Sequence, residues 1–396
     1  MLMKAITLVV AIRLAVIALV IAIVIIIVIA STSYYFSHKK PVTHLVEFTA
    51  PFVFGRFIVP EDNPLTKESV ELGRRLFYDP ILSSNNQVSC ATCHKQALAF
   101  TDGLKTSIGV SGTPLSFNAM SLVNLMWGPK HFFWDGRSPS LEDQALHPIE
   151  HIDEMARDID QLVVELNKDK TYKKLFKQAY GSVTAQGIVK ALANFQRTLI
   201  SANSRYDQYL RGEITLSPQE EQGRKLFMAH PDTKVTLRGG NCIDCHSQFL
   251  TSGFATAFDG FSNNGLDNDQ ALQAGLFTLT NNEAHRGLFK APTLRNIAVT
   301  APYMHDGRFA TLEQVLAHYN GGIKRSKTLS PLIIEADNIP KTQNDHISLN
   351  LNEQEIVAII AFLHTLTDEE FLANSAFANP FLEQSLERNL EKSRHD

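Results

Sequence analysis

The sequence predicts an all-α protein of two tandem, duplicated domains behind an N-terminal transmembrane helix. Three observations lead to this prediction: each half carries a C-x-x-C-H motif, the segments around the motifs repeat, and apolar residues recur with helical spacing. The expected boundaries are an anchor or signal at 1–31, a linker at 32–60, a first domain at 61–212, a second domain at 213–368 and a C-terminal tail at 369–396.

The composition excludes several classes of protein. The chain has 396 residues, which corresponds to two or three domains at about 150 residues per domain. Its 37 lysines and arginines against 41 acidic residues give a net charge of −4, which argues against a nucleic-acid-binding surface or an acidic disordered tail. Four cysteines are too few to cross-link a chain of this length, which can bury a large core without disulfides.

An apolar segment near the N-terminus is long enough to cross a membrane. From Ala5 to Ala30 its only charged residue is Arg13, and a spanning helix needs about 20 apolar residues. A cleaved signal peptide is the alternative, because Val28-Ile29-Ala30 resembles a cleavage site. The apolar region of a signal peptide, however, usually has only about 7–15 residues. We therefore expect an uncleaved anchor.

The four cysteines define two motifs that attach a covalent cofactor. The motifs are Cys90-Ala-Thr-Cys93-His94 and Cys242-Ile-Asp-Cys245-His246. This spacing is the attachment signature of c-type haem, in which both thiols bond to the haem edge and the adjacent histidine is the proximal iron ligand. Two redox dithiols or one Cys₄ zinc site are the alternatives. Two covalent haems indicate the periplasmic side of a bacterial inner membrane, to which the anchor would hold the protein.

Self-comparison of the sequence indicates a duplication. Three stretches of the first half recur in the same order in the second. These pairs are Glu71–Phe77 with Glu221–Phe227, Ala119–Asn124 with Ala291–Asn296, and Trp134–Glu142 with His305–Glu313. Ser217 and Asn352 each begin a capping pattern, with a glutamate three residues later, so helices are expected to start there. Residues 254–284, rich in Gly, Asn and Asp, predict a long loop.

The repeat also predicts that the two irons differ. Aligning Asp135–Arg137 with Asp306–Arg308 places Pro148 opposite Tyr319. If this position faces the iron on its distal side, proline leaves the first haem open to a small molecule, whereas tyrosine closes the second through its oxygen. Alternatively, Tyr319 is an ordinary core aromatic. The ligand candidates are then Met304, His305 and His318.

An open haem that reacts with peroxide needs a group that moves a proton from one peroxide oxygen to the other. We expect Glu154 to be this acid and base, and Gln144 to orient the bound peroxide by hydrogen bonding. His147 and His151 lie nearby in the sequence. His147 could instead cap the first haem, which would make the protein an electron carrier.

Over residues 60–367 the chain resembles the bacterial di-haem cytochrome c peroxidases and their MauG relatives. The stretches that carry the resemblance are Asn63–Thr66, Leu76–Pro80, Val88–His94, Phe100–Gly103, Phe133–Arg137, Phe289–Asn296 and Tyr303–Gly307. The resemblance implies two cytochrome c-like haem domains. It also implies that Trp134 relays electrons between the haems and that Gln144 and Glu154 belong to the distal pocket.

The resemblance further implies a calcium ion between the haems, bound by Asn118 and by the carbonyl oxygens of Thr300 and Pro302. Two departures from the family's peroxidases follow the MauG pattern. Those peroxidases carry a histidine that blocks the first iron, and no histidine stands between residues 103 and 117 here. They also place a methionine on the second haem, where this chain has Tyr319.

These inferences predict a periplasmic di-haem peroxidase that reduces hydrogen peroxide to water at an open N-terminal haem. A c-type cytochrome or another redox protein would supply electrons through the C-terminal haem. One alternative is a MauG-like oxidase that modifies tryptophan or tyrosine side chains of a partner protein. The non-enzymatic alternative is a di-haem electron carrier. The inner membrane is an expected partner, nucleic acid is not, and the resemblance implies a homodimer because the family's peroxidases are dimers.

Overall fold

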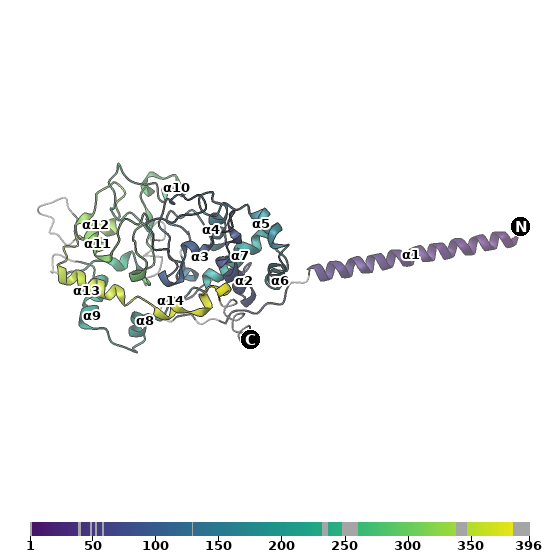
Figure 1. Cartoon of the computed structure of the whole chain (residues 1–396), viewed down its shortest axis with the longest axis horizontal. Coiled ribbons are helices and arrows are strands. Elements are labelled where there is room, and N and C mark those ends of the chain that lie inside the picture. The colour runs from purple at the N-terminus through teal and green to yellow at the C-terminus, as the bar shows by residue number, and fades with distance from the viewer. Residues whose placement is uncertain are drawn as a thin grey trace, which may run out of the picture. The chain divides into compact units, whose positions relative to one another are not determined.

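The computed structural model describes residues 2–38, 41–47, 50–51, 54–57, 59–128, 130–231, 237–247, 260–337 and 347–382. The described chain is mostly helical, as predicted. In chain order its α-helices are α1 (Leu2–His38), α2 (Lys67–Tyr78), α3 (Cys90–Cys93), α4 (Leu141–Glu150), α5 (Ile159–Leu166), α6 (Lys170–Ala179), α7 (Ala185–Arg197), α8 (Arg205–Leu210), α9 (Pro218–Met228), α10 (Phe277–Thr280), α11 (Leu312–Ala317), α12 (Pro331–Glu335), α13 (Glu353–His364) and α14 (Glu369–Ala373) (Figure 1). Strands β1 (Phe261–Ser262) and β2 (Phe289–Lys290) form a short antiparallel pair.

The chain divides into two units, Met1–Val42 and Thr43–Asp396. Helix α1 belongs to the first, and its stretch Ile12–Ile29 is apolar and long enough to cross a membrane, a criterion that a signal sequence also meets. The predicted linker 32–60 lies partly outside the described residues. Where it is described beyond Thr43, it is attached to the second unit: the backbone nitrogen of Val46 donates to the carbonyl oxygen of Leu65 at 3.0 Å.

Two pairs of helices organise the second unit. Helix α2 packs against α7, and α9 packs against α13. A Cβ atom at Gly73 would lie 1.9 Å from the carbonyl oxygen of Ala191, and one at Gly223 would lie 1.9 Å from that of Ala358. Only glycine therefore permits the two backbones to come this close. Both glycines occupy the same place in the repeated stretch that precedes each cysteine motif.

Each helix pair contributes to its own apolar core. The first core contains Leu72, Leu76, Phe77, Leu192 and Phe195, and the second contains Leu226, Phe227, Ile359, Phe362 and Leu363. The predicted helix starts are confirmed, because Ser217 and Asn352 both form capping boxes with the glutamates three residues later. Local sequence signals thus position the helices on which each core is built.

Replacing Gly73 by alanine is expected to lower the free energy of unfolding by about 1–3 kcal/mol, because the new methyl group must push α2 away from α7. Chemical unfolding of the haem-loaded protein, followed by far-ultraviolet circular dichroism, measures this. Gly187→Ala is the control, because Gly187 also lies in a helix, α7, but its Cβ position is 3.2 Å from movable side-chain atoms of Phe176 and Thr184 and meets no backbone carbonyl. Equal losses in the two variants would contradict the close-contact explanation.

Part of the predicted C-terminal tail belongs to the folded unit. Residues 383–396 of that segment lie outside the described residues, but Phe371 and Phe377 are buried in the first core. The Tyr78 hydroxyl donates to the carbonyl oxygen of Phe377 at 2.7 Å, and Arg74 Nε donates to that of Ala378 at 2.7 Å. The chain therefore returns from the end of the second core to pack on the first.

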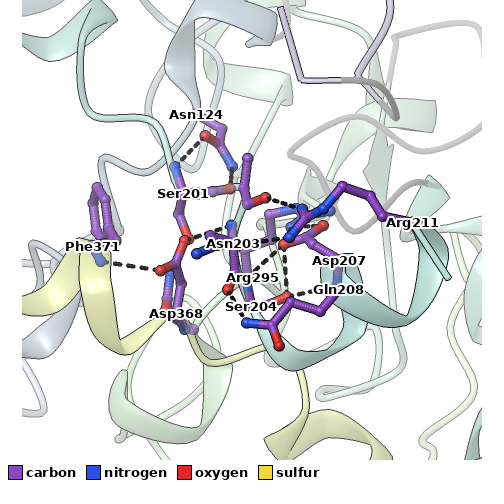
Figure 2. A network of polar contacts seen from close by, with 12 residues as sticks. Asn124, Ser201, Asn203, Ser204, Asp207, Gln208, Arg211, Arg295, Asp368 and Phe371 are labelled. Carbon is purple, nitrogen blue, oxygen red and sulfur yellow. Dashed lines mark hydrogen bonds and ion pairs between the residues drawn. The ribbon is translucent and has the colours of Figure 1, made fainter. Parts of the chain in front are cut away.

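Buried polar contacts join the two cores (Figure 2). On the side of the second core, next to its members Tyr206 and Leu294, Asp207 and Arg295 form an ion pair at 2.7 Å, with side chains only 2% and 1% exposed. Asn296 accepts a hydrogen bond from the backbone nitrogen of Asp368 at 2.8 Å and donates to the Ser201 hydroxyl at 3.0 Å. Removing one partner would leave a buried polar group unpaired, so these contacts hold the cores in one arrangement.

Candidate functional site

The first cysteine motif lines a cavity in the first core. Cys90 and Cys93 form α3, and they border this cavity together with His94. The Nδ1 atom of His94 lies 2.7 Å from the carbonyl oxygen of Phe100, which leaves Nε2 for a metal ion. Burial lowers the pKa of His94, which favours the neutral imidazole that a metal requires. These residues fit a c-type haem.

The second motif lines a separate cavity in the second core. Cys242, Cys245 and His246 border it, and His246 Nδ1 lies 3.0 Å from the carbonyl oxygen of Pro292. Burial lowers the pKa of His246 to about 4 and raises that of Cys242 to about 12. The two motifs line different cavities, which argues against a shared Cys₄ zinc site. The raised pKa of the Cys242 thiol also argues against a reactive dithiol, whose thiolate needs a lowered pKa.

The predicted distal residues of the first haem all reach the first cavity. Gln144 and Pro148 come from α4, and Glu154 comes from the turn that follows this helix. The Oε1 atom of Gln144 is buried and has no hydrogen-bond partner among the described residues, so it is available to a ligand. His147 and His151 also line the cavity, but their side chains are 46% and 51% exposed.

Glu154 is held by a close approach of two loops. Its carbonyl oxygen accepts a hydrogen bond from the backbone nitrogen of Val110 at 2.8 Å. A Cβ at Gly109 would lie 2.4 Å from that oxygen and 2.0 Å from the carbonyl oxygen of Asp153, so glycine is required there. Burial raises the pKa of the Glu154 carboxyl, and the electrostatic interaction with His151 works in the opposite direction. A carboxyl with a raised pKa holds and releases a proton more readily than an ordinary carboxylate does, which suits it to proton transfer.

Trp134 lines both cavities and is itself buried. Its indole nitrogen donates to the carbonyl oxygen of Asn118 at 2.9 Å, and its own carbonyl oxygen accepts from the backbone nitrogen of Lys290 at 3.0 Å. The ring of His305 lies edge-on to that of Trp134, with the ring centroids 6.5 Å apart. It also stacks on the ring of Phe289, with the centroids 3.7 Å apart. Aromatic contacts therefore continue from Trp134 into the second cavity.

Of the three residues predicted to bind calcium, Asn118 is the one whose contacts place it beside Trp134. Asn118 lies beside the segment after Pro302, because its backbone nitrogen donates to the carbonyl oxygen of His305 at 2.8 Å. The side-chain amide of Asn118 donates to the carbonyl oxygen of Leu104 at 2.8 Å. The hydroxyl of Thr300 donates within its own turn, to Ile297 at 3.2 Å. The calcium site stays a prediction.

The second cavity contains more than one candidate iron ligand. Tyr319, Met304 and His305 line it, whereas His318 is not among its lining residues and bonds the carbonyl oxygen of Asn264 at 3.0 Å. The side-chain nitrogen of Asn264 lies 3.3 Å from the Tyr319 hydroxyl and 3.4 Å from the Met304 sulfur. Tyr319 and Met304 therefore lie next to each other, and both remain candidates together with His305.

Asn264 was not predicted from the sequence. It lies in the segment predicted as a long inserted loop, where no periodic pattern singles out one residue. Its only signal is that it sits in a run of asparagine and glycine, which are frequent in turns. Tyr319 itself lies in a π-helical turn, His318–Gly322, which directly follows α11. Such turns are frequent at functional sites.

Known proteins are similar to this chain in sequence and in fold. A sequence profile described as "Di-haem cytochrome c peroxidase" matches residues 67–215. A methylamine utilization protein MauG of Methylorubrum extorquens is 38% identical over 315 residues, which cover 78% of this chain and 81% of that protein. The chain belongs to the di-haem cytochrome c peroxidase family. This di-haem protein is thus a peroxidase-type oxidoreductase, and its family implies two c-type haems.

Two further relatives show the range of this family. A cytochrome c551 peroxidase of Nitrosomonas europaea is 33% identical to this di-haem protein over 315 residues, covering 78% of the chain and 82% of the relative. The crystal structure of a MauG-like protein associated with microbial copper homeostasis is 33% identical. Its TM-score is 0.72, with 85% of this chain and 99% of that chain covered. Peroxidases and MauG proteins both resemble this chain at similar identity.

Proposed function

We propose that the protein reduces hydrogen peroxide at the haem held by Cys90, Cys93 and His94, with electrons that enter through the second haem. The observation that carries this proposal is the contrast between the two cavities. Pro148, which offers no iron ligand, lines the first cavity with Glu154, and the two histidines there, His147 and His151, are about half exposed. Three potential ligands, Tyr319, Met304 and His305, line the second cavity. A small oxidant would therefore bind in the first cavity.

Glu154 and Gln144 would handle the proton and the orientation of the substrate. The two haems, when bound, supply the iron at which peroxide is reduced and the centre that passes electrons to it. Glu154 would take the proton of the near peroxide oxygen and deliver it to the far oxygen. The free Oε1 of Gln144 would accept a hydrogen bond from the substrate. Two electrons and two protons convert one peroxide to two waters.

Trp134 would relay electrons between the haems, and Tyr319 would ligate the second iron together with His246. The contact of Trp134 with both cavities supports the first role. The position of the Tyr319 hydroxyl beside Asn264 in the second cavity supports the second. A tyrosinate ligand stabilises oxidised iron, so both haems could share the oxidising equivalents of peroxide. In the alternative, MauG-like function, the final reductant is a tryptophan or tyrosine of a partner protein.

A duplication at 61–212 and 213–368 is part of this proposal. The asparagine that ends each Ala-to-Asn repeat supports it: Asn124 has φ +60° and Asn296 has φ +62°. Their backbone nitrogens donate to equivalent places after α7 and α13, to Leu199 at 2.8 Å and to Leu366 at 2.9 Å. Two copies of one haem domain would share this hydrogen bond, which joins the asparagine to a residue just after α7 in one copy and just after α13 in the other.

The location and assembly are also proposed. Helix α1 would anchor the protein on the periplasmic side of the bacterial inner membrane, where c-type haem is attached. A c-type cytochrome would be the electron donor, a calcium ion would bind at Asn118, Thr300 and Pro302, and the protein would form a homodimer. The apolar stretch Ile12–Ile29 supports the anchor.

Peroxide consumption by the full-length, haem-loaded protein with reduced cytochrome c tests this function, together with electron paramagnetic resonance of the oxidised protein. We expect one high-spin and one low-spin haem and rapid, peroxide-dependent oxidation of cytochrome c. A high-spin haem with slow turnover would support the MauG-like alternative. Two low-spin haems would refute the open site and leave an electron carrier.

A further inference from the structure

A strap of chain, defined here as residues 368–377, crosses from the second core to the first. It begins at Asp368, whose side chain accepts hydrogen bonds from the Ser201 hydroxyl and from the backbone nitrogen of Phe371, both at 3.0 Å (Figure 2). The backbone nitrogen of Asp368 donates to Asn296 at 2.8 Å. Because Asp368 is only 2% exposed, these contacts fix the start of the strap between the two cores.

The strap reaches the turn that orients His94. In this turn Ala99 has φ +49° and Phe100 has φ +61°, left-handed conformations that a Cβ atom disfavours. Both side chains are completely buried. The carbonyl oxygen of Phe100 is the group that lies 2.7 Å from His94 Nδ1. An unfavourable backbone persists only where its surroundings impose it, so the direction of this carbonyl depends on what packs on the turn.

The side chain that packs on this turn from the strap is Phe371. Its ring centroid lies 5.9 Å from that of Phe100, with the planes at 59°, and it is 2% exposed. Phe77 of α2 also contacts the Phe100 ring, at 5.9 Å. The side-chain nitrogen of Gln96 donates to the strap carbonyls of Asn374 at 2.8 Å and Phe371 at 3.2 Å. The strap is thus joined to the turn by both a ring contact and hydrogen bonds.

We propose that Phe371 is a positioning residue for the proximal ligand of the first haem. By packing on Phe100 it holds the left-handed turn, and the carbonyl oxygen of Phe100 then sets the orientation of the His94 imidazole. The same strap is anchored at Asn296, in the segment whose Pro292 carbonyl orients His246. The strap therefore links the proximal sides of both haems by a route that does not include Trp134. This proposal depends on the proposed function in one respect, which is that His94 is the ligand of the first iron.

Resonance Raman spectroscopy of the full-length, reduced, haem-loaded protein tests this proposal through the iron–histidine stretching band of the first haem. In Phe371→Ala we expect this band to shift or broaden, with the signal of the second haem unchanged. The reaction with peroxide should slow by about tenfold, because the imidazole should move by less than the 1 Å misplacement that can cost about 10²-fold. Phe371→Leu should restore most of the original band.

Phe377→Ala is the matched control. Phe377 lies in the same core and contacts Phe371 at 5.4 Å, so its loss opens a similar cavity in the strap. The control should leave the iron–histidine band unchanged. Equal shifts in the two variants, or an unchanged band in Phe371→Ala, would overturn the proposal.

Gln96→Ala keeps the proposal testable if Phe371→Ala does not fold. Gln96 is partly exposed, and its truncation removes two hydrogen bonds to the strap without opening the core. We expect a smaller band change in the same direction, and no change would overturn the proposal. The iron–histidine band is recorded on the reduced protein and does not require the protein to react with peroxide. A wild-type protein that does not reduce peroxide would refute the proposed function and still leave this test decisive.

Discussion

Replacing Glu154 by glutamine is expected to slow the reaction of the oxidised protein with hydrogen peroxide by about 10²–10⁴-fold. The amide has nearly the same shape as the carboxyl, so the loops that hold residue 154 through Val110 should stay in place. It cannot take a proton from one peroxide oxygen and deliver it to the other. Stopped-flow absorbance of the haem bands measures the rate of this step.

The pH dependence of the same step should identify Glu154 as the group involved. Burial disfavours the charged carboxylate and raises the pKa of Glu154 above its usual value of 4.5. Because the base form accepts the proton, the rate should rise as the pH rises through this raised pKa and be lost below it. The rise should be absent from Glu154→Gln.

Glu150→Gln is the control for these measurements. Glu150 is exposed at the end of α4 and does not line the first cavity, so its neutralisation changes local charge without touching the reaction. The control should react at the wild-type rate with the wild-type pH profile. Near-normal reaction of Glu154→Gln, or a pH profile that survives in it, would contradict the proton-transfer role.

Replacing Tyr319 by phenylalanine is expected to change the low-spin signal of the second haem and to raise its reduction potential. An anionic oxygen ligand stabilises oxidised iron, and its loss would leave the sixth position empty or open to the Met304 sulfur, which lies beside the same Asn264. Since axial ligands set haem potentials over a range of about 0.8 V, we expect a shift on the order of 0.1 V or more.

Spectroelectrochemical titration and electron paramagnetic resonance measure this change. Tyr303→Phe is the matched control, because Tyr303 also lines the second cavity but donates its hydroxyl to the carbonyl oxygen of Ile297 at 3.0 Å. The control should keep the wild-type signal. An unchanged signal and potential in Tyr319→Phe would make Met304 the better ligand.

Local features of the sequence were sufficient for much of the fold. The spacing of Cys90, Cys93 and His94 predicts a haem motif because attachment needs those atoms within one turn of chain. The capping boxes at Ser217 and Asn352 are equally local, since a cap bonds to a nitrogen three residues away. These predictions involve few residues, all close in sequence.

The parts that the sequence did not predict depend on residues far apart in the chain. Asn264 contacts Tyr319 across 55 positions, and Gln96 contacts the strap at Asn374 across 278 positions. The position of Glu154 depends on Gly109, whose missing side chain leaves no apolar pattern to detect. Such contacts are chosen by packing in three dimensions, and neither spacing nor composition along the chain records them.

By itself, the sequence predicted the two haem-attachment motifs with their proximal histidines and indicated the helices around them, because attachment chemistry and helix periodicity are both local. It also paired Pro148 with Tyr319, because a repeat can be aligned without a structure. Only the tertiary structure decided which groups share a cavity. It placed Trp134 against both cavities and brought Phe371 from the end of the second core onto the turn that orients His94. These relations arise when the cores pack together, since burial selects neighbours by shape and by paired polar groups rather than by order along the chain.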